Sequence, residues 1–273
     1  MPTAPDTAPA PQATTNSLAP MMAIGFGANF FDTLGVGSFA TTTAVLRLFH
    51  LVDDENLPGT LNVGHAIPTI SEAVIFIILL GGLIDIPTII SMVLAGGIGA
   101  WFGTGIVVHW PRRTIQLGMA AALIVTAAFM TVRMLLNLSL SEGTIGLTGI
   151  SLGLGVAASL VIGSITSLGI GNYAPTMAVT FLLGMNQKAV FPIMAASAAL
   201  ILPAAALRFY RAGRFDRRTA LGFAIGGIPG VLVAAFIVKE LPLDTVKWIV
   251  VAVLLYTSFT LWLASRDTTG AAS

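Results

Sequence analysis

Long apolar runs, interrupted by prolines and by single charged residues, form most of the sequence, and their hydrophobic positions do not alternate with polar ones. A helix needs about 20 apolar residues to cross a bilayer core of about 30 Å, whereas the strands of a membrane barrel alternate. The runs with the length of one crossing are 60–83, 87–109, 114–136, 190–210, 219–239 and 245–264. The pattern therefore predicts an all-α polytopic membrane protein.

Two further apolar segments, 18–49 and 145–184, are too long for one crossing, and each contains a glycine-rich interruption. The sequence Leu-Gly-Val-Gly-Ser-Phe-Ala at 34–40 matches Leu-Gly-Ile-Gly-Asn-Tyr-Ala at 168–174, and Gly-Gly-Ile-Gly at 96–99 matches Gly-Gly-Ile-Pro at 226–229. Matched glycines and prolines in the same order indicate a tandem duplication. The alternative is that glycine-rich membrane helices resemble one another by composition.

The duplication divides the chain into a tail at 1–17, a first transmembrane repeat at 18–136, a second at 145–264 and a C-terminal tail at 265–273. Each repeat is expected to contain one glycine-broken segment followed by three transmembrane helices. The first tail lacks both the basic region and the apolar stretch of a signal peptide, so we expect it to be disordered.

Composition narrows the class of protein. Hydrophobic residues make up 56% of the chain and charged residues 9%, and the mean hydropathy is +0.92. Soluble domains carry roughly 25% charged residues, so this composition argues against a water-soluble enzyme. The net charge of +1 offers no basic face for nucleic acid. Without cysteine, no disulfide or thiolate metal site can form, and we expect no cofactor.

The positive charges bear on the topology, because the cytoplasmic loops of membrane proteins carry the excess of Lys and Arg. If every segment crossed once, the two sides would receive seven and six of these residues, whereas a return of 145–184 to its own side changes the split to nine against four. The nine are Arg47, Arg112, Arg113, Arg208, Arg211, Arg214, Arg217, Arg218 and Arg266, opposite Arg133, Lys188, Lys239 and Lys247.

This split predicts repeats that are inverted relative to each other, with both termini cytoplasmic. The segment at 145–184 either re-enters the membrane or crosses it twice, since both arrangements return the chain to the same side. Arg47 and Arg133 lie near predicted helix ends and are expected to snorkel to the interface.

The glycine breaks are the candidate functional features. Unwound backbone within a membrane survives only inside protein or beside a wet cavity, and the helix after each break presents free N–H groups and a positive dipole end. We therefore predict a site for a small anion where the breaks meet. Its candidate residues are Gly35, Gly37, Ser38 and Thr41 in the first half, and Gly169, Gly171, Asn172 and Thr176 in the second.

Glycine also has a plainer use, which is to let helices pack closely. That use is the alternative for the two breaks. It is the role that we expect for the small-residue stripes of Ser91, Ala95, Gly99 and Gly103 and of Gly222, Gly226, Gly230 and Ala234, which recur at four-residue spacing.

Ionisable residues add a second signal. Asn62, His65, Thr69 and Glu72 share one helix face, and such a polar stripe in a membrane is expected to line a cavity. His65 is a candidate for substrate binding and Glu72 for proton coupling, with an ion pair of Glu72 to another helix as the alternative. Asp32 precedes the first break, where it either caps the next half-helix or binds a coupling cation.

These motifs resemble the TauE/SafE sulfite exporter family, also called the sulfite/organosulfonate transporter superfamily, over nearly the whole chain after the tail. The resemblance rests on the two Leu-Gly-(Val/Ile)-Gly-(Ser/Asn)-(Phe/Tyr)-Ala breaks and on the Gly-Gly-Ile-(Gly/Pro) segments followed by Pro111 and Pro242. Asn172 for Ser38 and Pro229 for Gly99 depart from exact symmetry between the halves.

The resemblance implies a secondary transporter of the cell inner membrane that moves sulfite or an organosulfonate such as sulfoacetate or isethionate, often by export. Its expected partners are this small anion, membrane lipid, and protons or another coupling ion; the oligomeric state is left open. The rival classes are a paired half-helix anion channel, which needs a continuous pore, and an intramembrane hydrolase, for which the sequence has no nucleophile motif.

Overall fold

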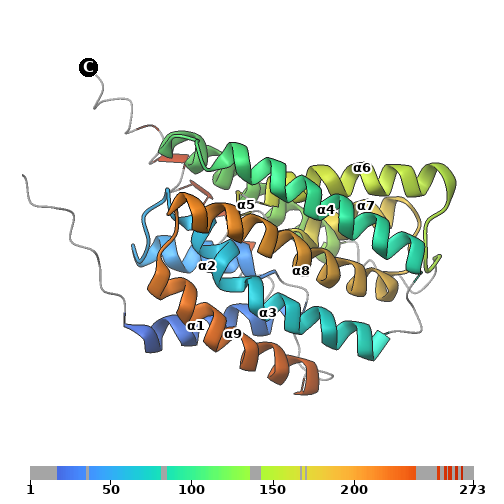
Figure 1. The fold of residues 1–273 in the computed structure, drawn as a ribbon, viewed down its shortest axis with the longest axis horizontal. Helices are drawn as coiled ribbons and strands as arrows, with labels where there is room; N and C mark the ends of the chain where they lie inside the picture. Colours follow the sequence, from blue (N-terminus) through green and yellow to red (C-terminus); the bar gives the residue numbers. More distant parts are fainter. Residues whose placement is uncertain are drawn as a thin grey trace, which may run out of the picture.

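The computed structural model describes residues 17–34, 37–80, 85–135, 143–166, 168–169 and 171–237, together with short helical pieces between 251 and 266. Its helices are α1 (Leu18–Thr33), α2 (Ser38–Leu48), α3 (Leu57–Leu80), α4 (Ile86–Val107), α5 (Arg112–Leu135), α6 (Gly149–Thr166), α7 (Tyr173–Leu182), α8 (Gln187–Ala212) and α9 (Arg217–Ile237) (Figure 1). The tail at 1–16, Gly35 and most of the helix predicted at 245–264 lie outside the described residues.

The helices have the lengths that membrane crossing requires. Five stretches are long and apolar enough to cross a bilayer: Leu57–Leu79, Ile86–Val107, Gly149–Thr166, Ala189–Ala212 and Arg217–Phe236. The prediction of an all-α polytopic membrane protein is thereby confirmed. The ends of five helices lie within three residues of the predicted bounds: α3, α4, α5, α8 and α9. The charges and prolines that delimit each apolar run also mark where the helix leaves the hydrocarbon region.

Both predicted interruptions are present. α1 ends at Thr33 and α2 begins at Ser38, preceded by Gly37 at a φ of 92°. α6 ends at Thr166 and α7 begins at Tyr173, and Gly169 and Gly171 between them have φ values of 90° and 72°. Residues with a Cβ rarely adopt a backbone conformation in this left-handed region. Glycine at these positions therefore permits the chain to leave one helix and start another.

The second broken segment turns back to the end of the molecule at which it starts. Thr144 donates its N–H to the Gly184 carbonyl at 3.0 Å, and Asn186 donates its N–H to the Thr144 carbonyl at 2.9 Å. The start of α6 and the end of α7 are therefore adjacent. α7 has 10 residues and is about 15 Å long, half of a bilayer core. A helix of this length is too short for a second crossing, which favours re-entry of the segment over two full crossings.

The first broken segment turns back in the same way. α1 begins beside the start of α9, since Met21 packs against Gly222. Asp216, just before α9, donates its N–H to Thr60 Oγ1 at 2.8 Å, which places the start of α3 at the same end. α2 leads directly into α3 through residues 49–56, so α1 starts and α2 finishes at one end of the molecule.

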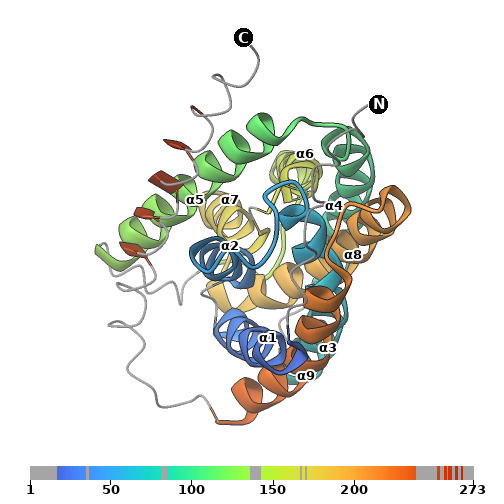
Figure 2. The same ribbon diagram turned by 90° about the vertical axis from the view of Figure 1, so that its left-hand side faces the viewer.

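The longer helices, apart from α5, form two groups of parallel helices (Figures 1 and 2). In the first group, α1, α3 and α9 run in one direction, and Gly222 and Gly230 of α9 meet Met21 and Phe26 of α1 in that order. In each of these contacts a Cβ in place of the glycine hydrogen would collide with α1. The stripe that begins at Gly222 is therefore a packing face, as predicted.

In the second group, α4, α6 and α8 run in the opposite direction (Figure 1). Gly99 and Gly103 of α4 lie against the backbone of Leu160 and Ser164 of α6, and the Ser164 hydroxyl donates to the Gly99 carbonyl at 3.0 Å. The glycines of the predicted stripe on α4 are thus also a packing face.

The two groups meet where α3 and α8 cross the molecule antiparallel to each other. The ring centroids of Phe76, late in α3, and Phe191, early in α8, lie 5.5 Å apart, while Gly59, early in α3, lies against Phe209, late in α8. Phe209 and Leu61 are fully buried there. This contact places the polar stripe of α3 in the centre of the molecule.

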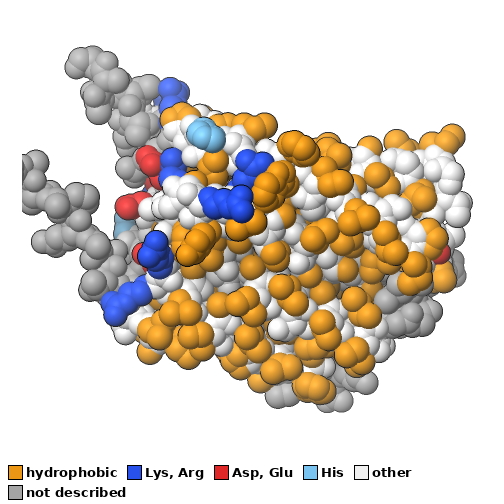
Figure 3. Space-filling model, in the orientation of Figure 1, with side chains coloured by type: hydrophobic (Ala, Val, Ile, Leu, Met, Phe, Trp, Pro, Cys, Tyr) orange, Lys and Arg blue, Asp and Glu red, His pale blue; other side chains and the backbone are white. Residues whose placement is uncertain are grey.

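The surface agrees with a lipid environment. Large apolar side chains such as Ile150 and Phe236 are exposed at 85% and 81%. The arginine side chains gather at the end where α9 begins and α8 finishes, as Figure 3 shows. Arg208, Arg211, Arg214, Arg217 and Arg218 belong to this end by their positions in α8, α9 and the turn between them.

Candidate functional site

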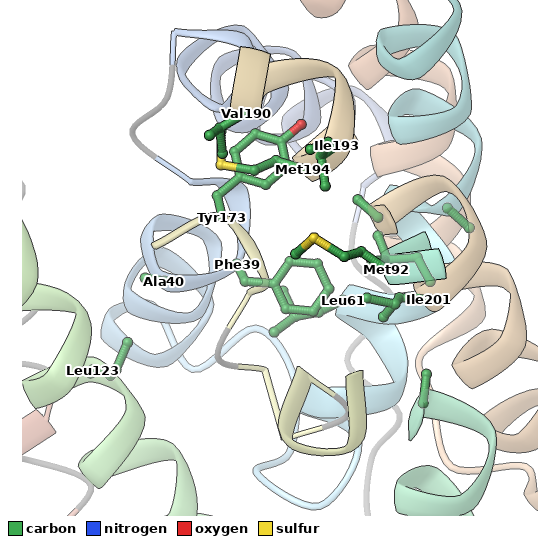
Figure 4. Close-up of a cluster of buried hydrophobic side chains, with 14 of the residues drawn as sticks. Phe39, Ala40, Leu61, Met92, Leu123, Tyr173, Val190, Ile193, Met194 and Ile201 are labelled. Atoms are coloured by element: carbon green, nitrogen blue, oxygen red, sulfur yellow. The ribbon is translucent and has the colours of Figure 1, made fainter. Parts of the chain in front are cut away.

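The two breaks meet inside the molecule. A Cβ on Gly171, in the second break, would lie 3.4 Å from the Cβ of Phe39, in the first turn of α2. Phe39 and Tyr173, the first aromatic residue after each break, belong to one buried cluster with Met194 of α8, and Figure 4 shows them in the same close-up. Both half-helices α2 and α7 therefore begin close to the centre, as the sequence predicts.

At the first break, Asp32 caps α2. Its Oδ1 accepts a hydrogen bond from the Ser38 N–H at 2.8 Å, and its Oδ2 accepts from the Ser38 hydroxyl at 2.8 Å. Asp32 is 4% exposed. The capping interpretation of Asp32 is thus confirmed, and it alters the expectation for Ser38, because both donors of Ser38 are already used within the protein.

The Thr41 hydroxyl is also engaged inside α2. It donates to the carbonyls of Gly37 at 3.0 Å and Ser38 at 2.9 Å, and Thr41 is only partly buried. Of the residues expected to bind an anion at the first break, neither Ser38 nor Thr41 therefore presents a free donor.

The second break is built differently. Thr166 occupies the position that matches Asp32, and its hydroxyl donates to the Ile162 carbonyl of its own helix at 2.7 Å. Asn172 donates its Nδ2 to the Met194 carbonyl at 2.9 Å, which fixes the break to α8. The Thr176 N–H donates to the Asn172 carbonyl at 3.0 Å as the first bond of α7. No carboxylate among the described residues caps α7 in the manner of Asp32.

The polar stripe of α3 is entirely buried, and most of it is satisfied within the protein. The imidazole of His65 is 0% exposed; Nδ1 lies 3.0 Å from Asn29 Nδ2, and Nε2 lies 3.2 Å from Thr42 Oγ1. Its ring is held between Phe39 and Phe223, at centroid distances of 5.8 and 5.2 Å. His65 thus joins α1, α2 and α3, and both of its ring nitrogens have partners.

Glu72 differs from the rest of the stripe. It is 0% exposed, and neither carboxylate oxygen has a hydrogen-bond partner among the described residues. The groups within electrostatic reach of it are the Asp32 carboxyl and the Tyr173 hydroxyl. The alternative that Glu72 forms an ion pair with another helix finds no support in the described residues.

Sequence reasoning missed the role of Tyr173. Its hydroxyl has no hydrogen-bond partner among the described residues, and the residue is 7% exposed. The available signal was the comparison of the two breaks, in which Tyr173 matches Phe39 and adds one hydroxyl group. Buried tyrosines normally find a partner for this group, so the Tyr173 hydroxyl is, like the Glu72 carboxyl, a buried polar group whose hydrogen-bonding capacity the described residues leave unused.

Arg47, at the end of α2, has a partner within the protein that the sequence did not predict. Its Nη1 forms an ion pair with both carboxylate oxygens of Asp54, and the Asp54 side chain is 1% exposed. Gln116 of α5 donates its Nε2 to Asp54 Oδ2 at 2.8 Å. The turn between α2 and α3 folds back over the helix end and supplies the buried carboxylate. The side chain of Arg133 lies outside the described part.

The comparisons with known proteins bear on the second half of the chain. A model of the family described as "Sulfite exporter TauE/SafE" matches residues 151–272. This stretch contains the second break and the Gly-Gly-Ile-Pro segment, so the resemblance found in the sequence motifs is confirmed. No curated protein and no solved structure matches the chain.

Proposed function

Because residues 151–272 match the model of the sulfite exporter TauE/SafE family, whose members are transporters and not enzymes, we propose that this chain exports a small sulfur-containing anion across the cell inner membrane. The anion is sulfite or an organosulfonate such as sulfoacetate or isethionate. The observation that carries the proposal is the meeting of two broken helices inside the molecule, with Gly171 against Phe39. Interrupted backbone at such depth is stable only where protein covers it or a polar solute binds.

The transporter consists of two inverted repeats related by a two-fold axis in the membrane plane. The packing supports this arrangement, because each broken segment lies on a helix of the other repeat: α1 on α9, and α6 on α4. Matching helices run in opposite directions, and the matching pair α3 and α8 meet antiparallel at the centre (Figure 1). Such an axis places the two breaks opposite each other.

The substrate class follows from the chemistry of the breaks. A sulfite or sulfonate group is compact and negatively charged, and it offers three oxygen acceptors to backbone N–H groups at a helix start. Gly169 and Gly171 give the backbone its left-handed turns before α7, where Asn172 and Thr176 lie buried. Gly37, before α2, has no atom within 4 Å of its Cβ position.

Alternating access is supported over a continuous channel. Asp32, Glu72, Asn172 and Tyr173 are all buried, and burial of the polar centre supports an occluded carrier over an open pore, whose polar lining would be in contact with water. A buried carboxyl such as Glu72 is a natural carrier for a coupled proton. The arginine-rich end supports a cytoplasmic position for that end and for both termini.

Transport assays in proteoliposomes test the proposal. The purified protein is expected to take up ³⁵S-labelled sulfite with saturation, and unlabelled sulfoacetate or isethionate is expected to compete, whereas a carboxylate such as lactate competes poorly. Gly171→Leu places a bulky side chain at a φ of 72° and toward Phe39, so it is expected to abolish uptake. Gly153→Leu is the matched control, because nothing lies within 4 Å of its Cβ position. Uptake that never saturates, or equal uptake by both variants, would contradict the proposal.

A further inference from the structure

We propose that the two breaks have different roles: the anion binds beside the second break, where the Tyr173 hydroxyl donates to it, and Glu72 carries a proton that moves with the anion in the same direction. This inference rests on the proposed transport function and specifies its binding group and the sign of its coupling. Tyr173 is the binding residue, and Glu72 is the proton carrier.

The first break is unsuited to an anion. The Asp32 carboxyl already accepts from the N–H and the hydroxyl of Ser38, so the first backbone N–H of α2 and the hydroxyl beside it are taken by the protein's own acid. A second negative group at this place would meet the Asp32 oxygens at short range within a buried environment, where repulsion between like charges is strong.

The second break lacks such an acid, because Thr166 stands where Asp32 stands in the first half and bonds within its own helix. It begins α7 with Tyr173, whose buried hydroxyl has no hydrogen-bond partner among the described residues. A buried polar group without a partner is costly, and an oxygen of a sulfite or sulfonate group would satisfy this hydroxyl. Asn172 bonds to the Met194 carbonyl and holds the start of α7 in place against α8.

Glu72 connects this donor to protonation. The Tyr173 hydroxyl has one proton to donate, and it lies within reach of the Glu72 carboxyl. When Glu72 is ionised, one of its oxygens can accept the hydrogen bond of the Tyr173 hydroxyl, and its charge repels the anion. When Glu72 is protonated, the hydroxyl is free to donate to the anion, and the repulsion by Glu72 is removed. Anion binding and Glu72 protonation are therefore linked positively.

No other titratable side chain among the described residues provides the charge that would replace this proton. Asp32 on α1 and Tyr173 on α7 are the groups that act on Glu72, and His65 shares its helix with both ring nitrogens partnered. The parts of α8 and α9 packed at the centre, 189–207 and 220–237, contain no ionisable residue. When a monoanion binds and Glu72 takes up a proton, the net charge of the site stays the same.

Positive linkage between proton and anion means symport. Export then proceeds when the outward gradient of the anion exceeds the opposing proton gradient, and a tenfold anion gradient offsets one pH unit. An antiporter would need binding of the proton and the anion to exclude each other, which is the reverse of the arrangement around Glu72.

The test measures anion flux and luminal pH together. Proteoliposomes with entrapped pyranine receive external ³⁵S-isethionate or ³⁵S-sulfite while valinomycin and potassium hold the membrane potential at zero. Isethionate is useful because its sulfonate stays ionised and brings no proton of its own. For sulfite, the luminal acidification measured in protein-free liposomes is subtracted. Symport acidifies the lumen as the anion enters. Luminal alkalinisation, or anion entry without proton movement, overturns the inference while leaving transport itself established. Absence of any saturable flux overturns the proposed function instead.

Two variants locate the effect. Tyr173→Phe keeps the ring and removes one hydrogen bond to a charged ligand, so the KM of anion uptake is expected to rise about 10- to 150-fold. Tyr210→Phe is the matched control, because Tyr210 is 62% exposed. An unchanged KM in Tyr173→Phe overturns the assignment of Tyr173. The circular dichroism spectrum of each variant verifies that the helices are retained.

Glu72→Gln fixes the site in a neutral state. Wild-type anion affinity is expected to fall about tenfold per pH unit once Glu72 ionises, because the anion binds only the protonated form. In Glu72→Gln, anion exchange is expected to continue with a pH-independent KM and without luminal acidification. Glu55→Gln is the matched control, since the Glu55 side chain is 47% exposed. A Gln variant that still acidifies the lumen would overturn the role of Glu72.

Discussion

Replacement of Asp32 tests whether its carboxyl is a helix cap or a carrier of the coupling ion. Asp32→Ala removes both acceptors of Ser38, which lie 2.8 Å from its N–H and its hydroxyl, and the group is 4% exposed. Each buried donor left without a partner costs about 1–3 kcal/mol, and the hydroxyl can rotate to a weaker acceptor, so we expect a loss of about 2–4 kcal/mol in unfolding free energy.

Asp32→Asn separates the two roles. The amide oxygen can still accept from the Ser38 N–H, and the amide nitrogen can donate to the Ser38 hydroxyl after the hydroxyl rotates, so we expect a loss below about 1 kcal/mol. Because the amide carries no proton that ionises, a cap predicts that proton-coupled uptake persists in Asp32→Asn. A coupling carboxyl predicts that luminal acidification is lost although the protein is stable.

Unfolding in mixed micelles titrated with SDS and followed by circular dichroism measures stability, and the proteoliposome assay measures coupling. Asp85 provides the matched control, because it caps α4 through Thr88 in the same manner, with its Oδ2 accepting from the Thr88 N–H at 3.0 Å, but lies far from the breaks at a helix end. Asp85→Ala is expected to lower stability by about 1 kcal/mol and to leave uptake unchanged. Equal stability of Asp32→Ala and Asp32→Asn would refute the capping argument.

Three further outcomes follow from the packing, the ion pair and the topology. Gly99→Ala is expected to destabilise the protein by about 1–3 kcal/mol, because its Cβ would meet the backbone of α6, while SDS titration of Gly153→Ala shows little change. Arg47→Ala is expected to cost about 3 kcal/mol by the same titration, because it leaves a buried carboxylate without its cation; a loss below 1 kcal/mol would contradict this. The chain has no cysteine, so single cysteines report sidedness: a maleimide that does not cross membranes is expected to label Thr148→Cys from outside intact cells and Arg211→Cys only after permeabilisation, and the reverse pattern would refute the cytoplasmic placement of the arginine-rich end.

The helices and their breaks could be predicted because they depend on local properties of the sequence. The length of an apolar run predicts whether it can cross the membrane as a helix. Glycine at 37, 169 and 171 permits the left-handed backbone that separates two helices. For the second segment, charge parity is the same for re-entry and for two crossings, so the sequence alone does not separate them. The length of α7, 10 residues, favours re-entry.

The contacts of the site depend on partners far away in the sequence, and these could not be predicted. His65 fits the pattern of a cavity-lining residue, yet Asn29 and Thr42 of two other helices hold its ring nitrogens. Arg47 lies at a helix end, where snorkelling is common, but Asp54 in the following turn forms a buried ion pair with it. Hydropathy contains no information about either pairing.

The differences between the two halves are more informative than their similarity. Where the first break has Asp32, the second has Thr166, and where the first has Phe39, the second has Tyr173. The first half therefore has a carboxyl that the second lacks, and the second has an aromatic hydroxyl that the first lacks. Both groups, Asp32 and the Tyr173 hydroxyl, lie near Glu72. An exactly symmetric pair would place an acid at each helix start and repel an anion from both. In the proposed function, duplication supplies the two facing helix starts, and divergence makes one of them able to accept a negative charge.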